Sequence, residues 1–276
     1  MKRLTGVLVL GVMLSLAPNA NAIVTDGDWS DWFSYSGDVN HNNWREDLVT
    51  LNSVSTRTLA DEEGPTPGAG GQLYDIEQIF YRFDDADPNN DSSGGRLNIG
   101  LVTGFPPEGV VSDSLYAGDF FVDIGGTGGY DIAVATSTRA SDLGRYGNLW
   151  FNSGVPTNWI ETDVVYPQFN TSNPYRIDEA ASPGALDLTA LWNADVAWGG
   201  MGPHNFLEIS FDIDPGLEEL ISGEFGAIGL HWTMECGNDV INVTDNEPFA
   251  PVPEPSTMVL LGMGALGAIL RKKFVA

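Results

Sequence analysis

Four oxygen-bearing side chains recur at alternate positions in the segment DDADPNNDSSGGR and could bind a divalent cation. They are Asp85, Asp87, Asn89 and Asp91. Their spacing matches positions 1, 3, 5 and 7 of an EF-hand loop, in which oxygen ligands bind Ca²⁺. Position 6 is Asn90 where an EF-hand has glycine, and position 12 is Arg96 where it needs glutamate. The segment is therefore no EF-hand, and two interpretations stay open: a Ca²⁺ loop with fewer ligands, or a solvated turn.

A second group of acids lies in strand-like segments and could converge at one sheet edge. It comprises Asp75, Glu77, Asp119 and Asp123. If these side chains converge, they could form a further Ca²⁺ site.

Aromatic side chains near the start of the chain are candidates for binding sugars. Trp29, Trp32 and Trp44 lie among Asp, Asn and Ser residues, with Asp31 and Asn42 close by in sequence. An exposed indole offers a broad apolar face with a polar N–H at its edge, whereas a buried one packs in a core. The pattern favours stacking on sugar rings if the rings are exposed, and core packing if they are not.

Catalytic motifs are absent from the sequence. There is no Gly-x-Ser-x-Gly elbow, no His-Glu-x-x-His pair and no phosphate-binding glycine loop. The three histidines, His41, His204 and His231, are too widely spread to indicate a zinc site. A glycosidase needs only two suitably placed carboxylates, so this class stays open as an alternative. We expect a protein that is not an enzyme and assign no catalytic residue.

The first 22 residues are typical of a secretory signal peptide. Lys2 and Arg3 precede an apolar run over 4–16, and Ala20 and Ala22 stand where signal peptidase reads small residues. We expect cleavage after Ala22, the alternative being a retained N-terminal anchor.

The other end of the chain combines a proline-rich spacer, an apolar run and a basic cluster. Residues 256–270 are 15 uncharged residues, and as a helix they would span roughly 22 Å against about 30 Å of hydrocarbon. Pro253 and Pro255 oppose a longer helix, and the positive-inside rule keeps the basic residues Arg271, Lys272 and Lys273 in the cytoplasm. We expect a short transmembrane helix with the rest of the chain outside the inner membrane.

This tail resembles the PEP-CTERM sorting signal of Gram-negative bacteria that make exopolysaccharide. The matching features are Val-Pro-Glu-Pro-Ser-Thr at 252–257, with Glu254 between the two prolines, the apolar run, and the basic end. The resemblance implies an inner-membrane intermediate, cleavage near Pro-Glu-Pro by an exosortase, and delivery to the cell surface or extracellular matrix. A permanent membrane anchor is the alternative.

The central part of the chain, residues 23–250, is strongly acidic. It holds seven arginines, no lysine and 37 acids, a net charge of −30. Nucleic acid is excluded as a partner because phosphate binding needs a cationic surface. A polyanionic glycan would be repelled unless divalent cations bridged it.

The single cysteine, Cys236, excludes an intrachain disulfide, and its apolar surroundings favour burial over pairing between chains.

The central segment reads as an all-β domain, because short runs rich in β-branched and aromatic residues alternate with Gly, Asn, Asp and Pro. Between 205 and 213 apolar and polar residues alternate, which predicts a strand with one buried face and one solvent-exposed (wet) face. We expect an antiparallel β-sandwich or jelly roll with one short helix at 215–221. The expected strands are 78–83, 96–104, 118–125, 130–137, 148–152, 162–169, 205–213 and 225–236.

Four stretches resemble exported PEP-CTERM proteins whose outer domain is a β-sandwich similar to carbohydrate-binding modules. They are YDIEQIFYRFD, LNIGLVTGFPPEG, YAGDFFVDIG and HWTMECGND. The resemblance implies a sandwich with affinity for glycans. We therefore expect an exported, non-catalytic surface or matrix protein associated with exopolysaccharide or biofilm; the alternatives are an adhesion protein that binds a protein partner, or a glycoside-active enzyme.

Overall fold

The structure is a computed structural model of the 276-residue chain. It describes residues 23–38, 44–53, 56–60, 71–85, 95–110, 115–126, 129–138, 145–152, 159–160, 176–177, 185–187, 194–213, 227–237 and 239–246. The segment predicted to be a signal peptide, the helix expected at 215–221 and the whole predicted sorting tail lie outside these residues. So does the calcium-loop candidate, apart from the backbone of Asp85. No helix among the described segments has the length and hydropathy needed to cross a membrane.

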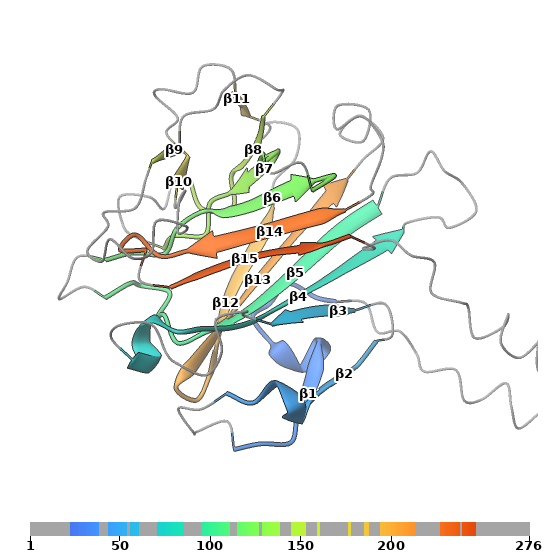
Figure 1. Ribbon diagram of the computed structural model, residues 1–276, viewed down its shortest axis with the longest axis vertical. Helices are drawn as coiled ribbons and strands as arrows, with labels where there is room; N and C mark the ends of the chain where they lie inside the picture. Colours follow the sequence, from blue (N-terminus) through green and yellow to red (C-terminus); the bar gives the residue numbers. More distant parts are fainter. Residues whose placement is uncertain are drawn as a thin grey trace, which may run out of the picture. The chain divides into compact units, whose positions relative to one another are not determined.

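Two antiparallel sheets form the domain, as Figure 1 shows. The five-stranded sheet has the order β12 (Asp195–Met201), β13 (His204–Ile213), β5 (Gly95–Thr103), β4 (Ile76–Asp85) and β3 (Arg57–Ala60). The six-stranded sheet has the order β11 (Ala185–Asp187), β8 (Leu149–Asn152), β7 (Ile132–Val134), β6 (Phe120–Ile124), β14 (Ile228–Thr233) and β15 (Val240–Asp245). The all-β antiparallel fold expected from the sequence is thereby confirmed.

Smaller elements complete the described part of the chain. Two strand pairs lie outside the main sheets: β1 (Phe33–Tyr35) with β2 (Val49–Leu51), and β9 (Trp159–Ile160) with β10 (Arg176–Ile177). Three single-turn 3₁₀ helices are η1 (Trp29–Asp31), η2 (Glu46–Leu48) and η3 (Gly71–Tyr74).

The main hydrophobic core lies between the two sheets. Alternate residues along each strand point into it, as the period of two in an extended chain requires. The five-stranded sheet contributes Ile79, Tyr81, Leu97, Ile99, Leu101, Leu207, Ile209 and Phe211, and the six-stranded sheet contributes Phe120, Val122, Ile132, Val134, Leu230 and Trp232. Cys236 is buried in the same core, as predicted.

Polar contacts join the two sheets at their margins. The Tyr81 hydroxyl on β4 donates to Asp245 on β15 over 2.5 Å. Asp239 accepts a hydrogen bond of 2.6 Å from the backbone of Ile76, next to the irregularity where β4 begins. Trp198 on β12 donates from Nε1 to the Thr136 carbonyl over 3.1 Å. These bonds connect the two sheets outside the apolar core.

The outer face of the five-stranded sheet, which points away from the six-stranded sheet, is not the wet face expected. Of the three polar residues between 205 and 213 that were expected to be wet, Asp212 is exposed, but Glu208 and Ser210 are each only 1% exposed. The expectation is wrong for Glu208 because the N-terminal segment lies over that part of the sheet and supplies its hydrogen-bond partners.

Candidate functional site

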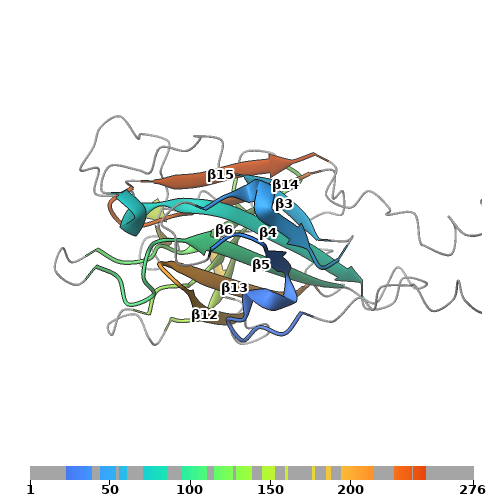
Figure 2. The same cartoon turned by 90° about the horizontal axis from the view of Figure 1, so that it is seen from below.

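The N-terminal segment, residues 23–51, covers part of this outer face with a second hydrophobic cluster. Figure 2 shows its blue elements beside the five-stranded sheet. Trp32 and Phe33 of the segment are buried against four residues of the sheet, namely Phe80, Val102, Met201 and Phe206. The sheet therefore has apolar contacts on both faces. Trp29, Tyr35 and Trp44 of the segment pack against this second cluster and remain partly exposed.

A single buried carboxylate fastens this segment to the sheet. Glu208 accepts hydrogen bonds from the backbone N–H of Asp26 over 3.0 Å, the backbone N–H of Gly27 over 2.5 Å and the Trp32 indole over 2.6 Å. Burial raises the pKa of Glu208, while the three donors act in the opposite direction because they stabilise its charged form. The carboxylate and the segment supply each other's hydrogen-bond partners, and the bonds of Glu208 to Gly27 and Trp32 are buried.

The backbone of the segment approaches β12 too closely for a side chain to lie between them. Gly27 has φ +84°, and a Cβ atom built there would lie 2.7 Å from the backbone of Trp198. A Cβ at Gly199 would lie 1.8 Å from the Gly27 carbonyl oxygen. Two glycines thus permit a contact that no other residue type would allow without displacement.

Three aromatic rings form a stack that rises from the sheet. Phe33 stacks on Phe80 of β4 with ring centroids 4.7 Å apart, and Trp29 stacks on Phe33 with centroids 5.3 Å apart. Phe80 and Phe33 are buried, whereas Trp29 is partly exposed. Trp29 is therefore the outermost ring of the stack, and it belongs to η1, whose first turn is capped by the Asp28 side chain.

A second aromatic pair lies beside the first stack. The rings of Tyr35 and Trp44 are 4.4 Å apart and nearly parallel, at 5°. The Trp44 indole N–H donates to Gln78 of β4 over 2.9 Å, and the edge of its ring meets His204. Both rings are partly exposed. We call Trp29, Trp32, Phe33, Tyr35 and Trp44 together the aromatic layer.

The three tryptophans predicted to bind sugar have different environments. Trp29 and Trp44 are partly exposed, but Trp32 is 1% exposed and donates to Glu208, so its ring has no free face for a ligand. The interpretation of Trp32 as a sugar-binding residue is therefore wrong. Asp31 accepts a hydrogen bond from the Val24 backbone over 3.2 Å, and Asn42 lies outside the described residues.

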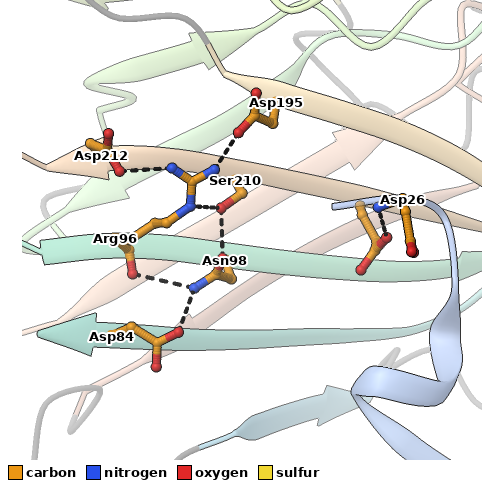
Figure 3. A network of polar contacts seen from close by, with 8 residues as sticks. Asp26, Asp84, Arg96, Asn98, Asp195, Ser210 and Asp212 are labelled. Carbon is orange, nitrogen blue, oxygen red and sulfur yellow. Dashed lines mark hydrogen bonds and ion pairs between the residues drawn. The ribbon is translucent and has the colours of Figure 1, made fainter. Parts of the chain in front are cut away.

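Beyond the N-terminal segment, the same sheet face carries a chain of polar side chains that crosses four strands (Figure 3). Arg96 donates to Ser210 over 2.6 Å, to Asp212 over 2.8 Å and to Asp195. Ser210 in turn donates to the Asn98 carbonyl oxygen over 2.6 Å, and Asn98 donates to Asp84 over 3.1 Å. We call this set the polar ladder; it consists of Asp84, Arg96, Asn98, Asp195, Ser210 and Asp212.

The middle of the polar ladder is buried and its ends are accessible. Asn98 and Ser210 are each 1% exposed. The side chains of Asp195 and Asp212 are 64% and 63% exposed, and that of Arg96 is 35% exposed. The exposed side chains of Asp195 and Asp212 are thus held in place by Arg96, which is itself hydrogen-bonded to the buried Ser210.

The remaining candidate groups are not gathered into a catalytic or metal centre in the part of the chain that the structure describes. His204 lies 3.3 Å from Glu77 and 3.0 Å from Gln72, whereas His231 is buried beside Phe121 and Tyr130 on the other sheet. His41 lies outside the described residues.

The second acidic group does not converge. Asp75 and Glu77 lie at the start of β4, whereas Asp119 and Asp123 lie at β6 in the six-stranded sheet, where Asp119 pairs with Arg145 over 3.0 Å. No three His, Cys, Asp or Glu side chains in the described segments form a metal-binding group. The predicted convergence is wrong, and the loop at 85–91 stays a prediction.

Sequence reasoning missed Glu208 and the polar ladder. The available signal was the presence of polar residues at alternate positions in two separate strand-like runs, Arg96 and Asn98 in one and Glu208, Ser210 and Asp212 in the other. Because these runs pair in register, with Asn98 opposite Ser210, the polar positions fall on one face. The pairing itself could not be read from the sequence.

An all-β domain followed by a C-terminal sorting motif is the arrangement of an exosortase-sorted surface protein. Residues 251–273 match the PEP-CTERM protein-sorting motif, which confirms the resemblance of the tail to that sorting signal. The chain is accordingly an exported protein sorted by the exosortase route to the cell surface. No curated protein and no solved structure matches the chain significantly.

Proposed function

We propose that the protein is a non-catalytic glycan-binding component of the cell surface or extracellular matrix, associated with exopolysaccharide in a biofilm. The observation that carries this proposal is the aromatic layer. Its rings are held rigidly by the sheet beneath them, yet Trp29 remains partly exposed at the end of a three-ring stack. A rigid exposed indole loses little conformational entropy when it binds and offers a flat apolar face to a sugar ring.

The non-catalytic part of the proposal rests on how the polar groups of this face are used. Glu208 already accepts three hydrogen bonds, and Arg96 already donates to three partners. A general acid or base must be within reach of a substrate proton. Groups committed to these partners serve to hold a binding surface rather than to transfer protons.

The test is retention on the exopolysaccharide of the producing cells. The exported protein is purified from those cells and passed over the immobilised polysaccharide, with and without Ca²⁺. We expect retention of the native protein and a loss of roughly three- to tenfold in affinity for Trp29→Ala, from about 0.5–1.5 kcal/mol of aromatic contact. Trp29→Phe should recover part of this loss.

Leu73→Ala serves as the matched control, because Leu73 is also an exposed apolar side chain, 42% exposed, but belongs to η3 rather than to the aromatic layer. Equal losses in Trp29→Ala and Leu73→Ala, or no retention of the native protein, would contradict the proposal. Release of reducing ends from the polysaccharide would instead identify a glycoside-active enzyme.

A further inference from the structure

We infer that the polar ladder and the aromatic layer together form one glycan-binding face, and that the polar ladder makes this face select neutral glycans over polyanionic ones. The inference rests on the proposed glycan-binding function and adds to it a second group of binding residues and a ligand class.

The polar ladder is continuous with the attachment point of the aromatic layer. Glu208, Ser210 and Asp212 are alternate residues of β13, so they follow one another on the same face at about 7 Å intervals. Glu208 holds Asp26 and Gly27 of the N-terminal segment, and Ser210 and Asp212 belong to the ladder. Figure 3 shows Asp26 on the same sheet face as the ladder. Trp29 is three residues after Asp26 and stacks through Phe33 on Phe80 of this sheet, so the aromatic layer and the polar ladder lie on the same sheet face.

The Arg96 guanidinium is poorly placed to bind an anion, because three of its five N–H donors already have partners and two of those partners are carboxylates. Each of its three nitrogens donates to a partner: Nε to Ser210, Nη1 to Asp212 and Nη2 to Asp195. Binding of a carboxylate, sulfate or phosphate by arginine typically uses two parallel N–H donors. An incoming anion would meet the two aspartates that already flank the guanidinium, and like charges would repel it.

The accessible groups of the ladder are acceptors instead. Asp195 and Asp212 each use one carboxylate oxygen for Arg96, and their side chains are 64% and 63% exposed. The second oxygen of each accepts no hydrogen bond from the described residues. Sugar hydroxyls are donors, and a hydrogen bond from a hydroxyl to a carboxylate is charge-assisted and strong. The ion pairs fix both carboxylates in place, so little ordering is left for the ligand to impose.

The charge of the whole domain acts in the same direction. Residues 23–250 carry seven arginines against 37 acids. A surface potential of this sign lowers the local concentration of a polyanion and leaves a neutral polymer unaffected. The local geometry and the overall field therefore favour the same ligand class.

The experiment uses the exported protein from the producing cells and its exopolysaccharide, separated by anion exchange into neutral and acidic fractions. Binding to each fraction is measured in EDTA, so that divalent cations cannot bridge acidic groups. We expect the native protein to bind the neutral fraction and to bind the acidic fraction at least tenfold more weakly. Trp29→Ala reports on the aromatic layer in parallel.

The double variant Asp195→Asn/Asp212→Asn tests the ladder directly. Asparagine keeps the shape and an acceptor oxygen but removes both negative charges beside Arg96. We expect binding of the neutral fraction to fall about tenfold and binding of the acidic fraction to rise, a reversal that simple destabilisation would not produce. Urea unfolding of the variant verifies that it is folded.

Three possible results distinguish failure of the inference about neutral glycans from failure of the proposed glycan-binding function. Binding of the acidic fraction in EDTA as tightly as the neutral one overturns the inference but leaves the proposed function standing. Neutral binding that depends on Trp29 and is unchanged in the double variant does the same. If the native protein binds neither fraction, the proposed function fails and the inference fails with it.

Discussion

Glu208 is the residue on which attachment of the N-terminal segment depends most. Replacement by alanine would leave the Gly27 N–H and the Trp32 indole without an acceptor in a buried place, and would remove the partner of the part-buried Asp26 N–H. We expect Glu208→Ala to lower the free energy of unfolding by about 3 kcal/mol or more. Urea unfolding measures this loss. Glu208→Gln retains one acceptor oxygen and should lose less; a loss below about 0.5 kcal/mol in Glu208→Ala would contradict the role assigned to Glu208.

Asp131, at the start of β7, should make stability depend on pH. Burial raises the pKa of Asp131 to about 6, the hydrogen bond from the Ile124 backbone lowers it, and the charge of Asp123 raises it further. In the unfolded chain an aspartate has a pKa of about 3.9. Between these values the native state binds the proton more tightly than the unfolded state, so its contribution to stability is present below pH 4 and is lost as the pH rises through 6.

Asp131→Asn removes this titration and keeps an acceptor for Ile124. Unfolding by urea at several values between pH 4 and pH 7 should show that the variant gains stability relative to the native protein as the pH rises. A difference between the two proteins that is independent of pH would rule out this role for Asp131.

At the scale of elements, the contact between the N-terminal segment and β12 depends on glycine. Gly199→Ala would place a methyl group against the Gly27 carbonyl, where the backbone must move. We expect it to destabilise the domain by about 1–3 kcal/mol and to expose the aromatic layer to protease. Thermal unfolding and limited proteolysis measure both effects.

The neighbouring residue of the same strand is a matched control. A Cβ atom at Gly200 would have nothing within 4 Å. Gly200→Ala should therefore be close to neutral, although it changes the same strand in the same way. Equal effects of the two substitutions would show that the segment does not rest on β12 as the structure describes.

The elements were predictable where one chemical pattern repeats along a strand. Seven expected strands coincide with β4, β5, β6, β7, β8, β13 and β14, and the eighth, 162–169, lies outside the described residues. Strand β12 was missed because Gly199 and Gly200 lower its β-propensity. Strands β1, β2 and β15 were also missed, although β15 has six residues rich in β-branched side chains. Which tryptophan is buried could not be predicted, since Trp29 and Trp32 differ in their tertiary contacts rather than in their local sequence.

At the scale of the whole molecule, charge should govern stability as well as binding. The domain's acids repel one another, and salt screens this repulsion, the Debye length falling from about 30 Å at 0.01 M to about 8 Å at 0.15 M. We expect the melting temperature to rise over this range of sodium chloride. Differential scanning calorimetry tests the expectation, and a melting temperature that falls with added salt would contradict it.

The central claim is that the sorting signal delivers the β-domain to the outside of the cell and is then removed. The most direct measurement is the intact mass and both terminal sequences of the protein recovered from the cell surface. We predict a chain that begins at Ile23 and ends near the Pro-Glu-Pro of residues 253–255. Recovery of a surface protein that still contains residues 256–276 would contradict the claim.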